Sequence, residues 1–130
     1  MAADHDARGN CWGHWAALVL ALVTPACIRH DDLKVRVFND GPAGMELENL
    51  HVFGGAEKAW WSTVAPGTSV GTLLRPRGEP ELSMTFVRAG HTHNWEGPKL
   101  IAGQGYTVHI HVDPTGAVTE QHCLMPCMLP

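Results

Sequence analysis

This chain of 130 residues lacks the features that mark several common protein classes. It has no run of basic residues, and its formal net charge is −4, so the electrostatic footprint of a nucleic-acid-binding protein is absent. No nucleophile elbow, phosphate-binding loop or dinucleotide fingerprint occurs. Acidic residues such as Glu46, Glu48 and Glu81 fall at expected turns or solvent-facing strand positions, which does not make a paired general acid and base. The sequence therefore predicts a protein that is not an enzyme.

Long hydrophobic runs are also missing. The longest, residues 15–26, is shorter than the about 20 residues that a membrane-spanning helix needs, but it has the length of the apolar region of a secretory signal. Small residues precede Cys27 in an arrangement that resembles the lipobox of bacterial lipoproteins, with Pro25 as a departure from the usual pattern. We expect residues 1–26 to be a signal peptide; the alternative is a buried helix of the folded domain. Cys27 is then the mature N-terminus and a candidate for lipidation, the only membrane attachment that we expect.

Tyrosine and phenylalanine are scarce, with one Tyr and three Phe, whereas 14 Gly and 9 Pro are spread along the chain as turn signals. From Leu33 onward, apolar residues recur with a period of two between these turns, which is typical of half-buried strands. The predicted strands are Leu33–Phe38, Leu47–Phe53, Trp60–Val64, Ser69–Leu74, Leu82–Val87, Tyr106–Val112 and Ala117–Gln121. This pattern predicts an all-β fold, a small antiparallel β-sandwich of immunoglobulin-like or transthyretin-like kind, with a small closed barrel as the alternative.

These patterns divide the chain into four parts. Residues 1–26 are the expected signal peptide, 27–32 a solvated tether, 33–122 the β-sandwich domain and 123–130 a tail that contains cysteine and methionine.

The tail offers two interpretations of its cysteines. In an oxidising compartment, Cys123 and Cys127 are expected to form a disulfide that closes a short loop. The alternative is a copper site, because thiolates and thioethers suit Cu(I), and His122, Met125 and Met128 lie beside the two cysteines.

Histidine is abundant, with nine residues, and two H-x-H pairs are candidate metal ligands. His109 and His111 lie on a predicted strand, where side chains two residues apart share a face and can reach one ion. His91 and His93 are expected in a loop, from which they could complete a copper or zinc site beside that strand. If the two pairs lie apart, all four are ordinary surface histidines and no cofactor is expected.

Trp60 and Trp61 are adjacent on a predicted strand, so they cannot both point into the core. We expect one of them to be exposed in a binding patch, or else to pack at an edge under a loop. The leading hypothesis is an exported, non-catalytic binding or structural module of the cell envelope, periplasmic, on the cell surface or secreted, with a protein partner and no nucleic acid. The alternative is an exported protein that binds copper or zinc.

Export makes a testable prediction about the N-terminus of the native protein. Because signal cleavage is expected before Cys27, N-terminal sequencing or intact mass should show a chain that begins there, with added acyl mass if the cysteine is lipidated. Recovery of an intact chain that begins at Met1 would rule out the signal peptide.

Overall fold

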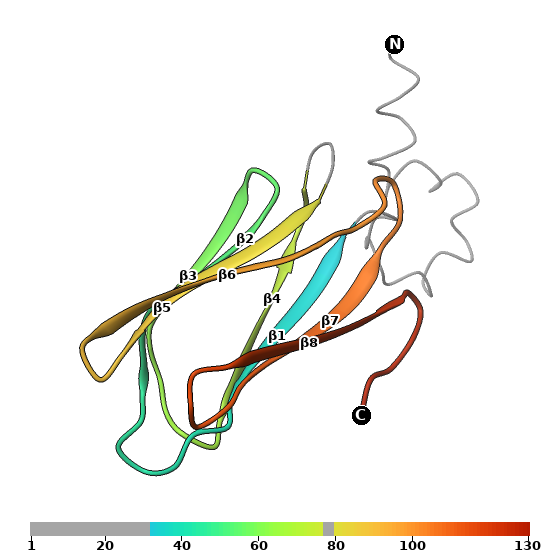
Figure 1. The fold of residues 1–130 in the computed structure, drawn as a ribbon. Coiled ribbons are helices and arrows are strands. Elements are labelled where there is room, and N and C mark those ends of the chain that lie inside the picture. Colours follow the sequence, from blue (N-terminus) through green and yellow to red (C-terminus); the bar gives the residue numbers. More distant parts are fainter. Residues whose placement is uncertain (1–31, 77–79) are drawn as a thin grey trace, which may run out of the picture. The chain divides into compact units, whose positions relative to one another are not determined.

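The computed structural model describes residues 32–76 and 80–130, in which every regular element is a β-strand (Figure 1). The strands are β1 (Leu33–Asn39), β2 (Leu47–Gly54), β3 (Glu57–Val64), β4 (Ser69–Leu74), β5 (Glu81–Arg88), β6 (His91–Lys99), β7 (Tyr106–Val112) and β8 (Val118–Leu124). Within these two described ranges, there is no helix of the length and hydropathy needed to cross a membrane. The predicted signal peptide, Cys27 and all of the predicted tether except Asp32 lie outside the described residues.

The strands form two four-stranded sheets. Sheet A has the order β4-β1-β7-β8, and sheet B has the order β3-β2-β5-β6. The β-sandwich that the sequence predicts is thereby confirmed, and the two separate sheets replace the alternative of one closed barrel. Every pair of neighbouring strands is antiparallel except β1 and β7, which run parallel with Leu33 beside Tyr106 and Asn39 beside Val112.

The core fills the space between the sheets and follows from the period of two in the sequence. In β1, Leu33, Val35 and Val37 are buried while the residues between them are exposed or half-buried. Val108, Ile110 and Val112 of β7 are fully buried beside them. From sheet B the largest buried side chains are Leu47, Leu50, Val52, Leu82, Met84 and Phe86. Burial of these apolar side chains is the main force that holds the two sheets together, at roughly 1.5–3 kcal/mol each.

The expectation that His91 and His93 lie in a loop is wrong, because both belong to the edge strand β6. Arg88 pairs with His91, so only Ala89 and Gly90 connect β5 to β6. Both linking residues have positive φ, 53° and 80°, as a two-residue hairpin of type I′ requires. Asn or Asp usually occupies the first position of such a turn, but this chain has Ala89 there, so the sequence does not indicate the turn. The polar residues of β6 also conceal the strand, since it is exposed along most of its length.

Asp32 belongs to the folded domain, although we expected it in the solvated tether, residues 27–32. Its side chain is fully buried, and its carboxylate lies 3.8 Å from the guanidinium of Arg75. Its carbonyl accepts a hydrogen bond from the backbone N–H of Tyr106. The backbone bond extends the β1–β7 ladder by one residue, and the ion pair offsets part of the cost of burying a carboxylate.

A buried polar network joins the two sheets at the end of the sandwich where β1, β5 and β7 meet their loops. Asn39, the last residue of β1, is fully buried. Its Nδ2 donates to the carbonyls of Met45 and Val64 at 2.9 and 3.0 Å. Its Oδ1 accepts from the backbone N–H of Gly41 at 3.0 Å and from the guanidinium of Arg88 at 2.7 Å. One amide thus satisfies groups from both sheets and from the loop between β1 and β2.

Arg88 is the cation of this network and is 3% exposed. Besides Asn39, it donates from Nη1 to the carbonyl of Asp113 at 2.6 Å. In the part of the chain that the structure describes, its Nε has no hydrogen-bond partner and its guanidinium forms no ion pair with a carboxylate. A Cβ at Gly41 would lie 2.9 Å from Nη2, so glycine leaves the room that the guanidinium needs. The buried charge is therefore held by neutral oxygen atoms alone.

Loss of the Asn39 amide is predicted to destabilise the domain strongly. Asn39→Ala would leave one buried and one partly buried carbonyl and part of the Arg88 guanidinium without partners, which predicts a loss of about 3–5 kcal/mol in the free energy of unfolding. Chemical denaturation monitored by tryptophan fluorescence measures this difference. The matched variant Asn94→Ala, on the exposed surface of β6, should change stability by less than about 0.5 kcal/mol. Equal effects of the two substitutions would contradict the role of the network.

Candidate functional site

The two adjacent tryptophans of β3 point in opposite directions. Trp61 packs against the core, whereas 54% of Trp60 is exposed on the outer face of sheet B. The expectation that one tryptophan of the pair is exposed is confirmed by these positions, and Trp60 is that residue. It is the largest exposed hydrophobic side chain among the described residues.

Two parallel rows of outward-facing side chains cross sheet B next to Trp60, and together they form the candidate site. The register aligns Trp60 of β3 with His51 of β2, then Thr85 of β5 and Asn94 of β6. The second row, two residues along each strand, consists of Lys58, Phe53, Ser83 and Glu96. We call these eight residues the sheet B face.

Three aromatic rings lie together at the β3 side of the sheet B face. The ring centroids of His51 and Trp60 are 6.3 Å apart, and those of His51 and Phe53 are 6.1 Å apart. Toward β6 the face becomes polar, with hydroxyl, amide and carboxylate side chains. An apolar centre beside polar groups is the composition of a binding surface, because the rings supply apolar contact area and the polar groups supply direction.

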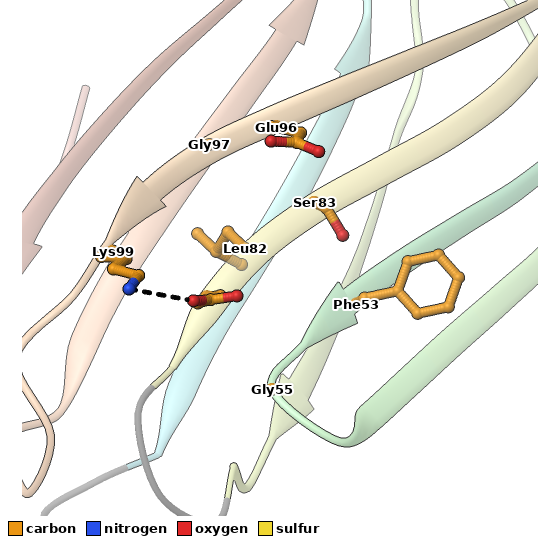
Figure 2. Close-up of a pocket in the computed structure, with 8 residues that line it drawn as sticks. Phe53, Gly55, Leu82, Ser83, Glu96, Gly97 and Lys99 are labelled. Atoms are coloured by element: carbon orange, nitrogen blue, oxygen red, sulfur yellow. Dashed lines mark ion pairs between the residues drawn. The ribbon is translucent and has the colours of Figure 1, made fainter.

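A hollow of about 270 Å³ lies at the polar end of the sheet B face (Figure 2). Phe53, Ser83 and Glu96 line it from three neighbouring strands, and the ion pair of Lys99 with Glu81, 3.3 Å long, closes one side. The hollow forms where the register between β5 and β6 shifts between Glu81 and Ser83.

Gly97 fits this irregular stretch of β6 because the indole of Trp95 lies against its backbone and leaves no room for a Cβ. Sequence reasoning missed the hollow, since a register shift is not visible in the alternation of single strands.

His109 and His111 lie on the outer face of sheet A, as the alternation in β7 predicts. Both rings contact Phe38 of β1, with centroid separations of 5.1 and 4.3 Å. Nδ1 of His111 is 2.8 Å from a carboxylate oxygen of Asp40. The two imidazoles therefore pack against an aromatic ring and, in one case, against a carboxylate.

The other histidines of the proposed metal site lie on sheet B. His93 stacks on the buried ring of Phe86 at 4.8 Å, next to the turn at Gly116, and His91 is exposed at the start of β6. His51 is on the outer face of sheet B, on the opposite side of the sandwich from His109. The structure does not bring the two H-x-H pairs together, and residues 32–76 and 80–130 contain no group of three or more His, Cys, Asp or Glu side chains arranged to hold an ion.

The predicted disulfide between Cys123 and Cys127 is present, with the two Cα atoms 6.2 Å apart. It folds the end of the chain back over sheet A. Cys123 lies opposite Thr107, and the N–H of Met125 donates to the carbonyl of Gly105 at 2.9 Å. We call residues 125–130 the strap. Since both sulfur atoms are in the disulfide, neither thiolate is free to bind copper as the alternative requires.

Two outward-facing residues of β7 lie beside the disulfide or the strap. Thr107 is only 7% exposed, although it faces away from the core. Burial is the largest influence on His109 and lowers the pKa of its imidazole below 6.5. A hydrogen bond with the backbone of Pro130 raises that pKa, and electrostatic interactions with His111, Arg36 and Lys34 lower it. The strap thus contributes a hydrogen bond to a histidine that sequence reasoning assigned to a metal.

No known protein family matches the chain, and no curated protein sequence matches it. Among solved structures, the NMR structure of a protein from Eubacterium rectale is similar, with a TM-score of 0.50 and 16% sequence identity over 77% of this chain and 94% of that one. At this level of identity the likeness supports the fold alone. The surface of the molecule, and the sheet B face in particular, is the remaining source of information on function.

Removal of the disulfide is predicted to have a small effect on stability and a measurable effect on His109. The bond joins residues only 4 apart in sequence, so chain entropy predicts that the double variant Cys123→Ser/Cys127→Ser loses about 2 kcal/mol or less. Release of the strap removes the Pro130 hydrogen bond, so the pKa of His109 should change, which an NMR titration of the ring protons can follow. An unchanged pKa in the folded variant would contradict the role of the strap.

In the intact protein, the pH dependence of stability has a definite sign. Because the pKa of His109 is lower in the folded chain, the unfolded chain binds more protons as pH falls below about 6.5. Stability from this residue is therefore complete above pH 6.5 and is lost as pH falls through the folded pKa.

Proposed function

We propose that this protein is an exported, non-catalytic binding module of the cell envelope or extracellular space, which binds a protein partner through the sheet B face. The observation that carries the proposal is Trp60, a large aromatic side chain that is more than half exposed and lies beside two further rings. Export, with Cys27 as the mature N-terminus and a lipid anchor or free secretion, is the part of the proposal that the sequence motivates.

Physical reasons favour this face over the opposite one. An exposed tryptophan loses little conformational entropy on binding and buries a large apolar area, so tryptophan is over-represented among the residues that dominate binding energy. On the sheet A side, Leu73 and Met128 are also exposed, but neither is aromatic, and Phe38 is already packed against two imidazoles. The polar side chains Asn94, Thr85 and Lys58 form the rim that protein interfaces commonly have.

The partner can be identified with a photo-crosslinking amino acid placed at position 58, beside Trp60 on the sheet B face, in cells that export the protein. The matched control places the same group at Leu73, which is 36% exposed on the opposite sheet. A protein that is crosslinked from position 58 but not from position 73, and that binds the purified domain, is the expected partner. Equal crosslinking from the two positions would argue against the sheet B face.

Trp60→Ala is predicted to weaken binding of that partner by about 30-fold, the factor expected for a residue worth about 2 kcal/mol in an interface. Isothermal titration calorimetry measures the change. Leu73→Ala should leave affinity within about twofold of the natural protein, and neither substitution should unfold the domain because both side chains are exposed. Unchanged affinity in Trp60→Ala would refute the proposed binding face.

A further inference from the structure

The hollow beside the sheet B face has a composition that selects one kind of side chain. Glu81 and Lys99 neutralise one another across 3.3 Å, which leaves Glu96 as the carboxylate that sets the charge of the hollow. Glu96 is exposed and makes no hydrogen bond or ion pair with any other residue in the described part of the chain. Its neighbours in the row are the hydroxyl of Ser83 and the ring of Phe53. A carboxylate without a partner and an aromatic ring both attract a cation.

The spacing of these groups suits a guanidinium. Phe53, Ser83 and Glu96 lie on three adjacent strands, so their Cα atoms span about 10 Å, twice the spacing between neighbouring strands. Figure 2 shows the Ser83 side chain between those of Glu96 and Phe53. A planar guanidinium above Ser83 can direct two N–H groups to Glu96 and lay its face or its apolar stem against Phe53. An ammonium can also contact the ring and the hydroxyl, but it lacks the planar fork that pairs with both oxygens of a carboxylate.

We infer that the hollow binds an arginine side chain of the protein partner, with Glu96 as the anion, Phe53 as the stacking surface and Ser83 as a hydrogen-bond acceptor. The inference rests on the proposed function, because it names the partner group that docks beside Trp60. It adds a chemical requirement that the aromatic rings alone do not impose, namely a positive charge next to the apolar anchor.

The hollow can be tested without the partner. N-acetyl-arginine methylamide serves as the probe, with N-acetyl-citrulline methylamide as a control of nearly equal shape without charge. Titration followed by amide chemical shifts should give saturable binding of the arginine compound, with the largest shifts around Phe53, Ser83 and Glu96. The citrulline compound should bind about fivefold more weakly or not at all, as expected for loss of a partly exposed ion pair.

Glu96→Gln should remove this preference, so that the two compounds bind equally. Glu48→Gln is the matched control, since it makes the same change of charge at an exposed position near the other end of β2. It should leave the arginine affinity within about twofold of the natural protein. Shifts that lie elsewhere, equal binding of the two compounds to the natural protein, or an unaltered preference in Glu96→Gln would each overturn the inference.

These outcomes are independent of the partner experiment. Failure of the arginine probe together with weaker partner binding in Trp60→Ala would overturn the inference and leave the proposed function intact. Arginine binding that depends on Glu96, together with unchanged partner binding in Trp60→Ala, would refute the proposed binding face and support the hollow as a guanidinium site.

Discussion

The hydrogen bond between Asn39 and Arg88 is the interaction on which the two-sheet arrangement most depends. Apolar side chains hold the sheets together, but apolar contact alone permits the sheets to slide or rotate, because it has little directional preference. The bond from Arg88 in sheet B to Asn39 in sheet A is directional, and both groups are buried. The same amide fixes the carbonyl at the end of β3, and the same guanidinium fixes Asp113 after β7. Four strand ends are thereby held in one relative position.

The turn after β7 holds Asp113 in the position from which its backbone carbonyl accepts the hydrogen bond from Arg88. Its carboxylate accepts hydrogen bonds from the hydroxyl and N–H of Thr115 and from the N–H of Ala117, which also lower the pKa of Asp113. With its side chain engaged in the turn, Asp113 contributes only its backbone carbonyl to Arg88. Buried charges held by neutral oxygens are sensitive to small shifts, since no ion pair compensates for a lost bond.

The disulfide between Cys123 and Cys127 lies beside the outer face of sheet A and has no counterpart on sheet B in the described part of the chain. On sheet A, Thr107 is buried opposite Cys123 of the disulfide, and the partly buried His109 lies beside Pro130. Across sheet B, Trp60 remains exposed, and Glu96 has no partner in the described part of the chain. The outer face of sheet B therefore presents both an aromatic ring and a carboxylate to solvent.

Alternation in the sequence was sufficient to predict most of the fold, because the period of two in β1, β5 and β7 reflects burial of one side of each strand. Alternation did not predict β6, because its residues are mostly polar and exposed and so do not alternate between apolar and polar. It also did not predict the turn at Ala89. Local patterns also predicted the disulfide, and they predicted that the side chains of Trp60 and Trp61 do not both point into the core. They could not predict the hollow or the separation of the histidine pairs, because these depend on which strands are neighbours. The order of strands in a sheet is set by packing between segments that are distant in the sequence, so it cannot be read from the residues of any single strand.

The parallel pairing of β1 with β7 also governs the order in which the domain can fold. All strands of sheet B come from residues 47–99, and two of its three pairs are hairpins joined by two residues. Sheet A instead requires Leu33 to find Tyr106, across the whole of sheet B in the sequence. Closure of such a long loop is entropically costly and slow compared with the formation of hairpins. During synthesis, β1 can pair with β4, but it remains without its second neighbour until Tyr106–Val112 has been made, so half of sheet A is missing from the inner side of sheet B for the same time. A chaperone or translocation factor that recognises exposed apolar strands has this interval in which to act on the chain.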